Sequence, residues 1–267
     1  MNSLERVTAT VQGDRVDRRA VAPLLSLYGS KLSSCSPETY FSDSNAYITG
    51  QCGVYETFTP DIIFGPFCFA KEGLPFGSEI EYYPHMPPNL KHPGILDADD
   101  LESCRVETLL HHPVVTYIEE SISGLLKHLG DKVPVAPIML SPVDMPVMML
   151  GMEKWLHTFL FEIHKTRQIL DLTIPYFVQR CNRLFDMGAP FIVVSGIFVN
   201  PGVLTRNMVE LSARPFIHTA FSQLQGPVIL HSGGKKMVPF LDVLNTLPQV
   251  AGFVVSSGED MCQARTR

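Results

Sequence analysis

The chain has little positive charge and no long apolar run free of proline. It carries 21 Lys and Arg residues against 27 Asp and Glu, a net charge of −6 over 267 residues, and its longest basic runs are pairs. A nucleic-acid surface needs clustered cations, so we exclude nucleic acid as a partner. The most apolar window, residues 133–150, is interrupted by Asp144 and by several prolines. Because proline breaks a helix interior, we expect no membrane-spanning helix there.

Other signals are also missing. The six cysteines have no CxxC spacing, which indicates reduced thiols and not a disulfide framework. No apolar segment follows the charges of residues 1–6, so we expect no signal peptide and a cytoplasmic location. No glycine-rich phosphate-binding loop follows an early strand, which argues against a nucleotide-binding open sheet.

Short apolar segments rich in β-branched residues alternate along the chain with segments of helical periodicity. We predict strands at 20–25, 61–67, 133–140, 191–195, 228–231 and 250–256, and helices at 3–11, 37–53, 113–130, 152–166, 169–187, 208–224 and 237–246. This alternation is typical of a parallel sheet wrapped by helices. A doubly wound open sheet and a TIM (β/α)8-type barrel both fit the pattern, and the missing phosphate-binding loops favour the barrel.

The pattern contains six strands, whereas a TIM barrel has eight. We therefore expect a single α/β barrel domain over residues 1–267, truncated after the sixth strand, which a continuation of the sequence or a partner chain would complete. An excursion rich in proline and aromatic residues, at about 71–100, is predicted to form a hairpin or an ordered loop over one face.

Residues 226–234 form the strongest candidate for a functional site. A short apolar strand ends there in His231, and Gly233 and Gly234 follow. Ligands of parallel α/β proteins bind where the carboxyl ends of the strands open into loops. Glycines at that point let a ligand approach the backbone. The alternative is that His231 only caps or packs against the following turn.

Four other polar residues lie after predicted strands or in turns rich in glycine and proline. Glu72 fits a site carboxylate that acts as a ligand or general base, or else a solvated loop acid. Asp144 fits either a contact to a ligand or the cap of the following helix. Ser195 and Asn200 follow the fourth strand, where polar side chains often contact ligands, although an Asn-Pro turn also explains Asn200.

A set of short segments occurs along the chain in a characteristic order and spacing. These segments are Glu5-Arg6-Val7, Gly13–Arg18, Pro60–Phe64, Lys71–Gly77, Pro87-Pro88-Asn89 and Gly226–Gly234. In them the chain resembles the uroporphyrinogen decarboxylase superfamily, which also contains the methylcobamide:coenzyme M methyltransferases. The resemblance covers essentially the whole chain. It implies a TIM barrel with its site at the C-terminal rim of the strands.

The methyltransferase branch of this superfamily fits better than the decarboxylase branch. The decarboxylases hold the carboxylates of their substrate with arginines after the first strand, and residues 24–31 contain none. In the methyltransferases a His-x-Cys pair after the fifth strand and a later cysteine bind zinc, which activates a thiol. His231 matches the histidine, but Gly233 stands at the cysteine position. Since one imidazole cannot hold zinc, a zinc ion at His231 would need Glu72, Cys68 or Cys262 as further ligands.

The resemblance leaves three functions open. The first is a corrinoid-dependent methyltransferase that moves a methyl group between a cobamide, carried by a corrinoid-binding partner protein, and a small methyl acceptor. In that reading His231 and Glu72 are catalytic, and Asp144, Ser195, Asn200 and Gly233 bind substrate or cofactor. The second is a uroporphyrinogen decarboxylase of tetrapyrrole biosynthesis. The third is a degenerate barrel without catalytic activity.

Overall fold

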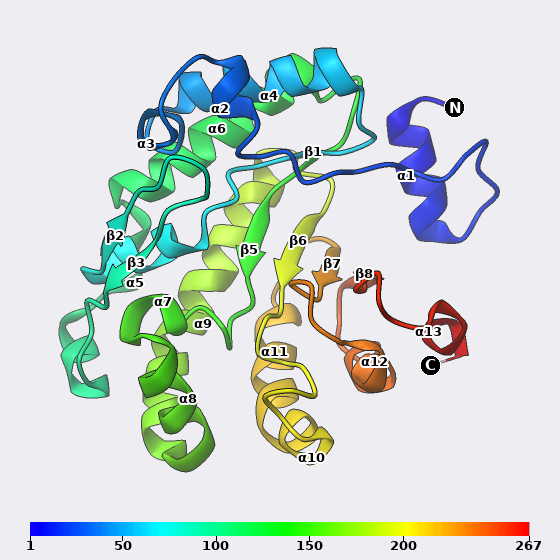
Figure 1. The fold of residues 1–267 in the computed structure, drawn as a ribbon. Helices are drawn as coiled ribbons and strands as arrows, with labels where there is room; N and C mark the ends of the chain where they lie inside the picture. The colour runs from blue at the N-terminus through cyan, green and yellow to red at the C-terminus, as the bar shows by residue number, and fades with distance from the viewer. Residues whose placement is uncertain (267) are drawn as a thin grey trace.

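The computed structural model describes residues 1–266 and shows an α/β protein built on parallel strands (Figure 1). Its strands are β1 (Ile63–Phe64), β2 (Glu79–Glu81), β3 (Asn89–His92), β4 (Val135–Ala136), β5 (Ile138–Leu140), β6 (Ile192–Ser195), β7 (Val228–His231) and β8 (Val250–Val254). β1 pairs with β4, and β5, β6, β7 and β8 form a four-stranded sheet in that order, with every pairing parallel. The predicted parallel α/β architecture is therefore confirmed.

β4 and β5 are one predicted strand that is interrupted at Pro137. Proline has no N–H to donate to a sheet ladder. The Pro137 carbonyl still accepts a hydrogen bond from the backbone N of Val193 in β6 at 2.9 Å, and Ala136 accepts one from Gly65 at 2.9 Å. The strands thus follow one another in the order β1, β4 with β5, β6, β7 and β8. Within residues 1–266, β1 and β8 are the two edges of this series.

Most helices cover one face of the strands and connect their ends, whereas α1 lies on the other face. The helices are α1 (Ser3–Gln12), α2 (Gly29–Leu32), α3 (Pro37–Tyr40), α4 (Ser44–Phe58), α5 (Val106–Leu110), α6 (Pro113–Leu129), α7 (Val147–Leu150), α8 (Met152–Phe161), α9 (Ile163–Asp186), α10 (Arg206–Met208), α11 (Arg214–Phe221), α12 (Leu241–Leu244) and α13 (Met261–Thr266). The 3-10 helices η1 (Phe69–Phe76), η2 (Ala98–Ser103) and η4 (Val238–Phe240) and the π-helical turn η3 (Val209–Ala213) lie between them. α9 and α11 run behind the strands in the view of Figure 1. No helix in the described part of the chain is long and apolar enough to cross a bilayer.

Some predicted boundaries are wrong, for local reasons. Residues 20–25 form no strand. Of their backbone carbonyls only that of Val21 forms a hydrogen bond with a neighbouring backbone segment, from Asp61 N at 2.8 Å, and one such bond does not make a strand pairing. The helix predicted at 152–166 ends earlier, and α9 begins earlier than predicted, because the backbone leaves the helical region at Glu162 (φ −125°, ψ 68°). The helix predicted at 208–224 contains a π-helical turn before α11.

Residues 71–100 contain the predicted hairpin. β2 and β3 pair antiparallel, with Ile80 opposite Leu90. Ser78 fastens the hairpin to α7: its hydroxyl donates to Met148 O at 2.8 Å and accepts from Gly94 N, just after β3, at 2.9 Å. A Cβ on Gly94 would lie 2.2 Å from the carbonyl oxygen of Phe76. The close approach of the two backbones therefore requires glycine at position 94.

The strands separate two apolar layers. Outward-facing side chains of β6 and β7, such as Val194 and Leu230, pack in the large core that includes the helices. Inward-facing side chains, such as Val193 and Ile138, pack in a smaller cluster with Val7 of α1. Because successive side chains of a strand point to opposite faces, positions 191, 193 and 195 and positions 229 and 231 share the inner face.

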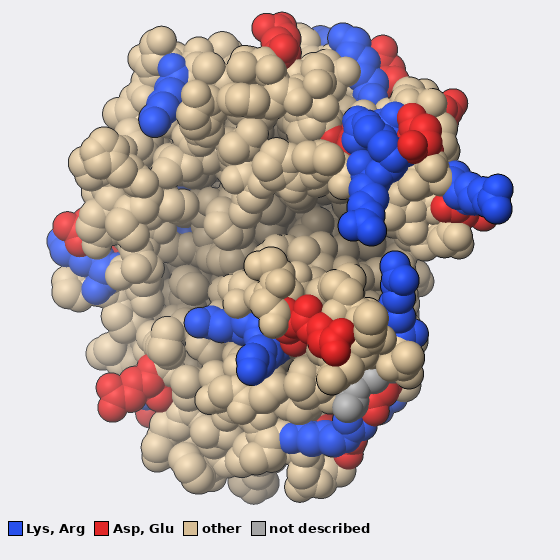
Figure 2. Space-filling model, turned by 45° about the vertical axis from the view of Figure 1, so that its right-hand side comes forward, with Lys and Arg blue, Asp and Glu red and all other residues tan. Residues whose placement is uncertain are grey.

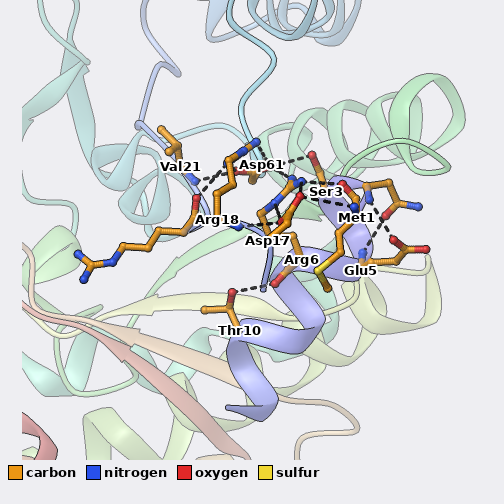
Figure 3. A network of polar contacts seen from close by, with 11 residues as sticks. Met1, Ser3, Glu5, Arg6, Thr10, Asp17, Arg18, Val21 and Asp61 are labelled. Carbon is orange, nitrogen blue, oxygen red and sulfur yellow. Dashed lines mark hydrogen bonds and ion pairs between the residues drawn. The ribbon is translucent and has the colours of Figure 1, made fainter. Parts of the chain in front are cut away.

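A buried carboxylate fastens α1 to the strands. Asp61, just before β1, is fully buried. It accepts hydrogen bonds from Ser3 Oγ at 2.9 Å, Arg6 Nη1 at 2.7 Å, Arg18 Nη1 at 2.5 Å and the backbone N of Val21 at 2.7 Å (Figure 3). Burial by itself would raise the pKa of Asp61, but these hydrogen bonds outweigh it and lower the pKa to about 2. The network thereby holds α1 beside the inner face of the sheet.

We predict that Asp61→Asn lowers the free energy of unfolding by about 3 kcal/mol, because it removes the buried carboxylate that Arg6 and Arg18 share and leaves Arg6 with Asp17 alone. The matched control is Asp17→Asn, since Asp17 also pairs with Arg6 but its side chain is 41% exposed. The control should lose much less stability in urea unfolding at pH 7. The folded pKa of Asp61 lies below its ordinary value. Its contribution should therefore be complete above pH 4 and disappear as the pH falls through 2. Equal losses in the two variants would contradict the assignment.

Candidate functional site

The inner face of the strands borders a cavity of about 740 Å³. One wall of the cavity is formed by α1 and residues 20–24. The opposite wall is formed by the inward-facing residues of β1 and of β5 to β8. The side chains that line the cavity are mainly apolar and include Val11, Leu24, Ile62, Phe64, Phe67, Phe69, Phe191, Val193, Ile229 and Phe253. Figure 2 shows the molecule with α1 and α13 turned forward, and this face is hollowed across its middle. Lys, Arg, Asp and Glu are absent from the lining within residues 1–266.

His231 stands at the end of β7, on the inner face. Its register partners are Ser195 in β6 and Val254 in β8, and its backbone carbonyl accepts a hydrogen bond from Gly196 N at 2.9 Å. The ring borders the cavity and is half-buried. Burial lowers the pKa of His231 below its ordinary value of 6.5, so the imidazole is neutral at pH 7. The structure thus presents a neutral imidazole at the carboxyl end of the central strands.

Gly233 fixes which nitrogen of His231 carries the proton. Its backbone N–H donates to His231 Nδ1 at 2.9 Å. Nδ1 is therefore the acceptor, and the proton of the neutral ring lies on Nε2. Gly233 has a φ of +59°, and a Cβ there would lie 3.0 Å from Cγ1 of Ile197. Both the backbone conformation and the lack of space favour glycine at this position.

Ser195 is the second polar group of the cavity. Its side chain lies on the inner face of β6 beside His231 and is 2% exposed. No atom of residues 1–266 forms a hydrogen bond with its hydroxyl. Thr10 of α1 also borders the cavity, but its hydroxyl donates to Arg6 O at 2.7 Å. The polar side chains that remain for a ligand are those of His231 and Ser195.

Asp144 does not border the cavity, and its carboxylate binds the backbone of a loop and not a ligand. It is fully buried between β5 and α7 and accepts hydrogen bonds from the backbone N of Ile197 at 2.8 Å, the backbone N of Phe198 at 3.3 Å and Ser141 Oγ at 3.0 Å. The prediction that Asp144 caps the following helix is wrong, because the N-cap of α7 is Pro146. Burial raises the pKa of Asp144 to about 7, against the opposing effect of the three hydrogen bonds. Its role is to join the loop after β5 to the loop after β6.

Asn200 serves its own turn. Its side-chain amide donates to Ile197 O at 2.6 Å, and its side-chain oxygen accepts from Gly202 N at 2.8 Å. Both polar atoms of the side chain therefore have partners within the loop 197–202. The structure supports the Asn-Pro turn that the sequence allowed, and it directs no polar atom of Asn200 into the cavity.

Glu72 is part of the protein core and does not border the cavity with His231. It lies in η1, is 4% exposed and forms an ion pair with Arg180 of α9, which is 2% exposed. The Arg180 guanidinium also lies 5.5 Å from the ring centroid of Tyr176. Burial lowers the pKa of Arg180, but the neighbouring Glu72 outweighs it and holds the pKa above its ordinary value. The expected pairing of Glu72 with His231 is corrected on this geometry: a buried carboxylate needs a charged partner, and Arg180 supplies it.

The residues around His231 do not fit a zinc site. Within residues 1–266, no group of three or more His, Cys, Asp and Glu side chains is placed to hold a metal ion. A zinc ion on Nε2 of a neutral imidazole would put the proton on Nδ1, where it would face the N–H of Gly233. Gly233, at the position expected for a cysteine, removes one possible zinc ligand. Its N–H also holds His231 in the tautomer that carries the proton on Nε2, and that nitrogen then has no lone pair for zinc.

The fold and this site can be compared with known proteins. The family model described as uroporphyrinogen decarboxylase matches residues 2–267. The chain belongs to the uroporphyrinogen decarboxylase family. A solved methyltransferase from Methanosarcina mazei has the same fold, with a TM-score of 0.82 at 16% sequence identity, over 95% of this chain and 75% of its own. No curated protein sequence matches the chain.

Parts of this family member's site were not predicted from its sequence. The sequence pattern places α1 in a helix and Phe64 and Phe67 in a strand, leaves Phe69 outside both, and predicts no cavity between them. Glu259 was not singled out either, yet its carboxylate accepts from the backbone N of Met237 and Val238 at 2.8 Å and of Ser256 at 3.2 Å. It thus fixes the segments after β7 and β8. In the sequence, only the position of Glu259 in the turn after the predicted strand 250–256 indicates this role.

We predict that Glu72→Gln lowers the free energy of unfolding by about 3–5 kcal/mol, because it leaves Arg180 buried without a counter-charge. Adding Arg180→Met to this variant should recover part of the loss. Glu153→Gln, at an exposed position of α8, is the matched control and should leave stability unchanged. Urea unfolding at pH 7 measures all three. A Glu72→Gln variant as stable as the wild type would show that the ion pair with Arg180 does not stabilise the fold.

Asp144 should make stability depend on pH in the direction opposite to Asp61. Its folded pKa lies above its ordinary value, so the folded state binds a proton that the unfolded state has released between pH 4 and pH 7. Wild-type stability should therefore fall, relative to Asp144→Asn, as the pH rises across this range, by on the order of 4 kcal/mol. Above pH 7 the difference should be constant. Parallel urea titrations of the two proteins at several pH values test this, and a difference independent of pH would refute it.

Proposed function

We propose that the protein is a corrinoid-dependent methyltransferase-like enzyme that moves a methyl group between a cobamide and a small acceptor molecule. The observation that carries the proposal is the apolar cavity with a neutral Nε2–H imidazole at the carboxyl end of the strands. Membership in the uroporphyrinogen decarboxylase family and the fold shared with a methyltransferase support it.

The size of the cavity indicates what enters it. A volume of about 740 Å³ lies in the range of sites for small organic ligands, ~300–1,000 Å³. The small acceptor fits such a space, whereas a cobamide with its side chains is a much larger molecule. We therefore place the acceptor in the cavity and the cobamide at its mouth, where a corrinoid-binding partner protein would present it. The bound cobamide supplies an electrophilic methyl group.

His231 and Ser195 would orient the acceptor. The Nε2–H of His231 and the hydroxyl of Ser195 are donors on adjacent strands, so a carboxylate, carbonyl or thiolate of the acceptor can receive both hydrogen bonds. A donor that favours the anionic form lowers the pKa of the acceptor and so raises the fraction present as the nucleophilic anion. His231 cannot act as a base through Nδ1, which already accepts the N–H of Gly233. The mainly apolar walls offer the reacting atoms few competing hydrogen-bond partners.

The composition of the lining argues against uroporphyrinogen as the substrate. That tetrapyrrole carries eight carboxylates, and bidentate arginines suit such groups best. No Lys or Arg side chain of residues 1–266 lines the cavity. Decarboxylation of a tetrapyrrole remains the alternative to be tested beside methyl transfer.

The direct test is the loss of methylcobalamin absorbance in the presence of the protein and a small thiol, with coenzyme M as the first acceptor. His231→Gln should lower the rate about 10²-fold or more, the usual cost of removing one well-placed donor. His128→Gln, at an exposed position of α6, should leave it unchanged. Treatment with a chelator should have no effect, because the site lacks a metal ligand set. Turnover of uroporphyrinogen without methyl transfer would instead assign the decarboxylase activity, and neither reaction would indicate a non-catalytic protein.

The tautomer of His231 can be measured without turnover. In nitrogen-15 spectra at pH 7 we expect the His231 ring to be protonated on Nε2 and unprotonated on Nδ1. The rate should fall on the acid side with a pKa below 6.5, since the imidazolium form carries a proton on Nδ1 that faces the Gly233 N–H. A ring protonated on Nδ1 at neutral pH would contradict both the assigned donor and the argument against zinc.

A further inference from the structure

The side chain of Lys71 is buried almost up to its amino nitrogen, which keeps a small contact with solvent. Lys71 lies in η1, and its side chain is 4% exposed. No carboxylate, carbonyl or hydroxyl oxygen of residues 1–266 pairs with its amino group. Lysine is almost never buried unless it is paired, because an isolated charge is costly to remove from water. The position therefore needs an explanation beyond packing.

The groups around Lys71 attract a cation but do not neutralise it. Its Nζ lies 4.6 Å from the ring centroid of Tyr117 in α6 and 6.0 Å from that of Tyr82 in the hairpin loop. The hydroxyl of Tyr117 donates to Tyr40 O at 3.0 Å, which fixes that ring. Ring faces carry a partial negative charge that favours a nearby ammonium group. They have no net charge, so the ammonium still lacks a counter-ion.

The thiol and the two phenols that lie nearest to Lys71 are uncharged at neutral pH. Burial raises the pKa of the Cys68 thiol to about 12. Burial also raises the pKa values of Tyr82 and Tyr117, and Glu38 and Cys68 add to the effect on Tyr82. The pKa of Lys71 itself is lowered by burial. No carboxylate of residues 1–266 forms an ion pair with this amine, and the carboxylate of Glu72, the next residue, is paired with Arg180.

His112 adds a second donor next to Lys71. It is the N-cap of α6, and its Nδ1 accepts from Val114 N at 3.2 Å, so the proton of the neutral ring lies on Nε2. Burial and the nearby charge of Lys71 lower the pKa of His112. The positive end of the dipole of α6, a helix of 17 residues, lies at the same place. The backbone N–H groups of Val114 and Val115 are already bonded, which leaves the two side chains to hold a ligand.

We propose that Lys71 and His112 form a second binding site, at the N-terminus of α6, for the carboxylate or phosphate group of an anionic ligand. The site lies beside the β2–β3 hairpin, and its outer wall is the loop that carries Tyr82 and Pro88. The carbonyl of Pro88 accepts from the Cys68 thiol at 3.9 Å and so ties this loop to the floor of the site. An anion bound here supplies the counter-charge that the fold omits. This site does not depend on the reaction proposed at His231.

The test follows the protonation of Lys71 by NMR in the full chain labelled with carbon-13 at the Cε of lysine. The Lys71 signal is the one that disappears in Lys71→Met, a variant that keeps the aliphatic packing against Tyr117. Sodium phosphate and sodium acetate are titrated separately at constant ionic strength. We expect the Lys71 signal to move to saturation with one of them and its titration midpoint to rise, because an anion favours the charged amine. Lys91, exposed on β3, is the internal control and should not respond.

The ring signal of His112 gives a second readout. In Lys71→Met, the anion concentration that half-saturates the His112 shift should increase at least ten-fold, while the urea midpoint shows that the variant is folded. A response to phosphate assigns a phosphate ligand, and a response to acetate alone assigns a carboxylate ligand. The proposal is overturned if neither anion moves Lys71 more than Lys91, or if the His112 response is the same in Lys71→Met.

Discussion

The parallel register between β6 and β7 is the constraint on which the candidate site depends. It places Ser195 beside His231 on one face, and the hydrogen bond from Gly196 N to His231 O, at 2.9 Å, holds that register at the carboxyl end. The Ser195 carbonyl in turn accepts from Ser141 N at 2.9 Å, which ties in the end of β5. A shift of β7 by one residue against β6 would turn His231 into the helical core and leave Ser195 on the inner face without it. The cavity, its two donors and the fixed imidazole all follow from this one alignment.

The residue pattern alone predicts those strands and helices whose limits depend on neighbouring residues in the chain. The strand 228–231 has the predicted bounds, and the helix predicted at 113–130 ends one residue earlier, at Leu129. The inward position of His231 follows from alternation along a strand once the bounds are known. Residues 20–25 are as apolar as a strand but lie across the sheet without pairing along it, and nothing in their own pattern reveals this.

Partners that are distant in sequence could not be predicted in the same way. Glu72 and Arg180 are separated by 108 positions, and Asp144 meets Ile197 and Phe198 from a different loop. Each of these carboxylates lies near a strand end, where a residue list alone suggests catalysis. Both are instead committed to holding the fold, because burial forces a carboxylate to find donors or a cation. The type of a residue after a strand is therefore a weaker guide to function than whether its polar atoms have partners.

Hydrogen-bond donors that have no acceptor in the protein mark the places where a ligand can bind. His231 Nε2–H and the Ser195 hydroxyl face an apolar cavity, and the Lys71 ammonium faces aromatic rings. All three groups can donate, so the ligands they select must bring acceptors. A metal ion brings none, and the nitrogen that would have to carry the proton if Nε2 bound a metal already accepts the N–H of Gly233. The methyl transfer that we propose would therefore rely on hydrogen bonds from His231 and Ser195 to the acceptor, in a pocket with mainly apolar walls.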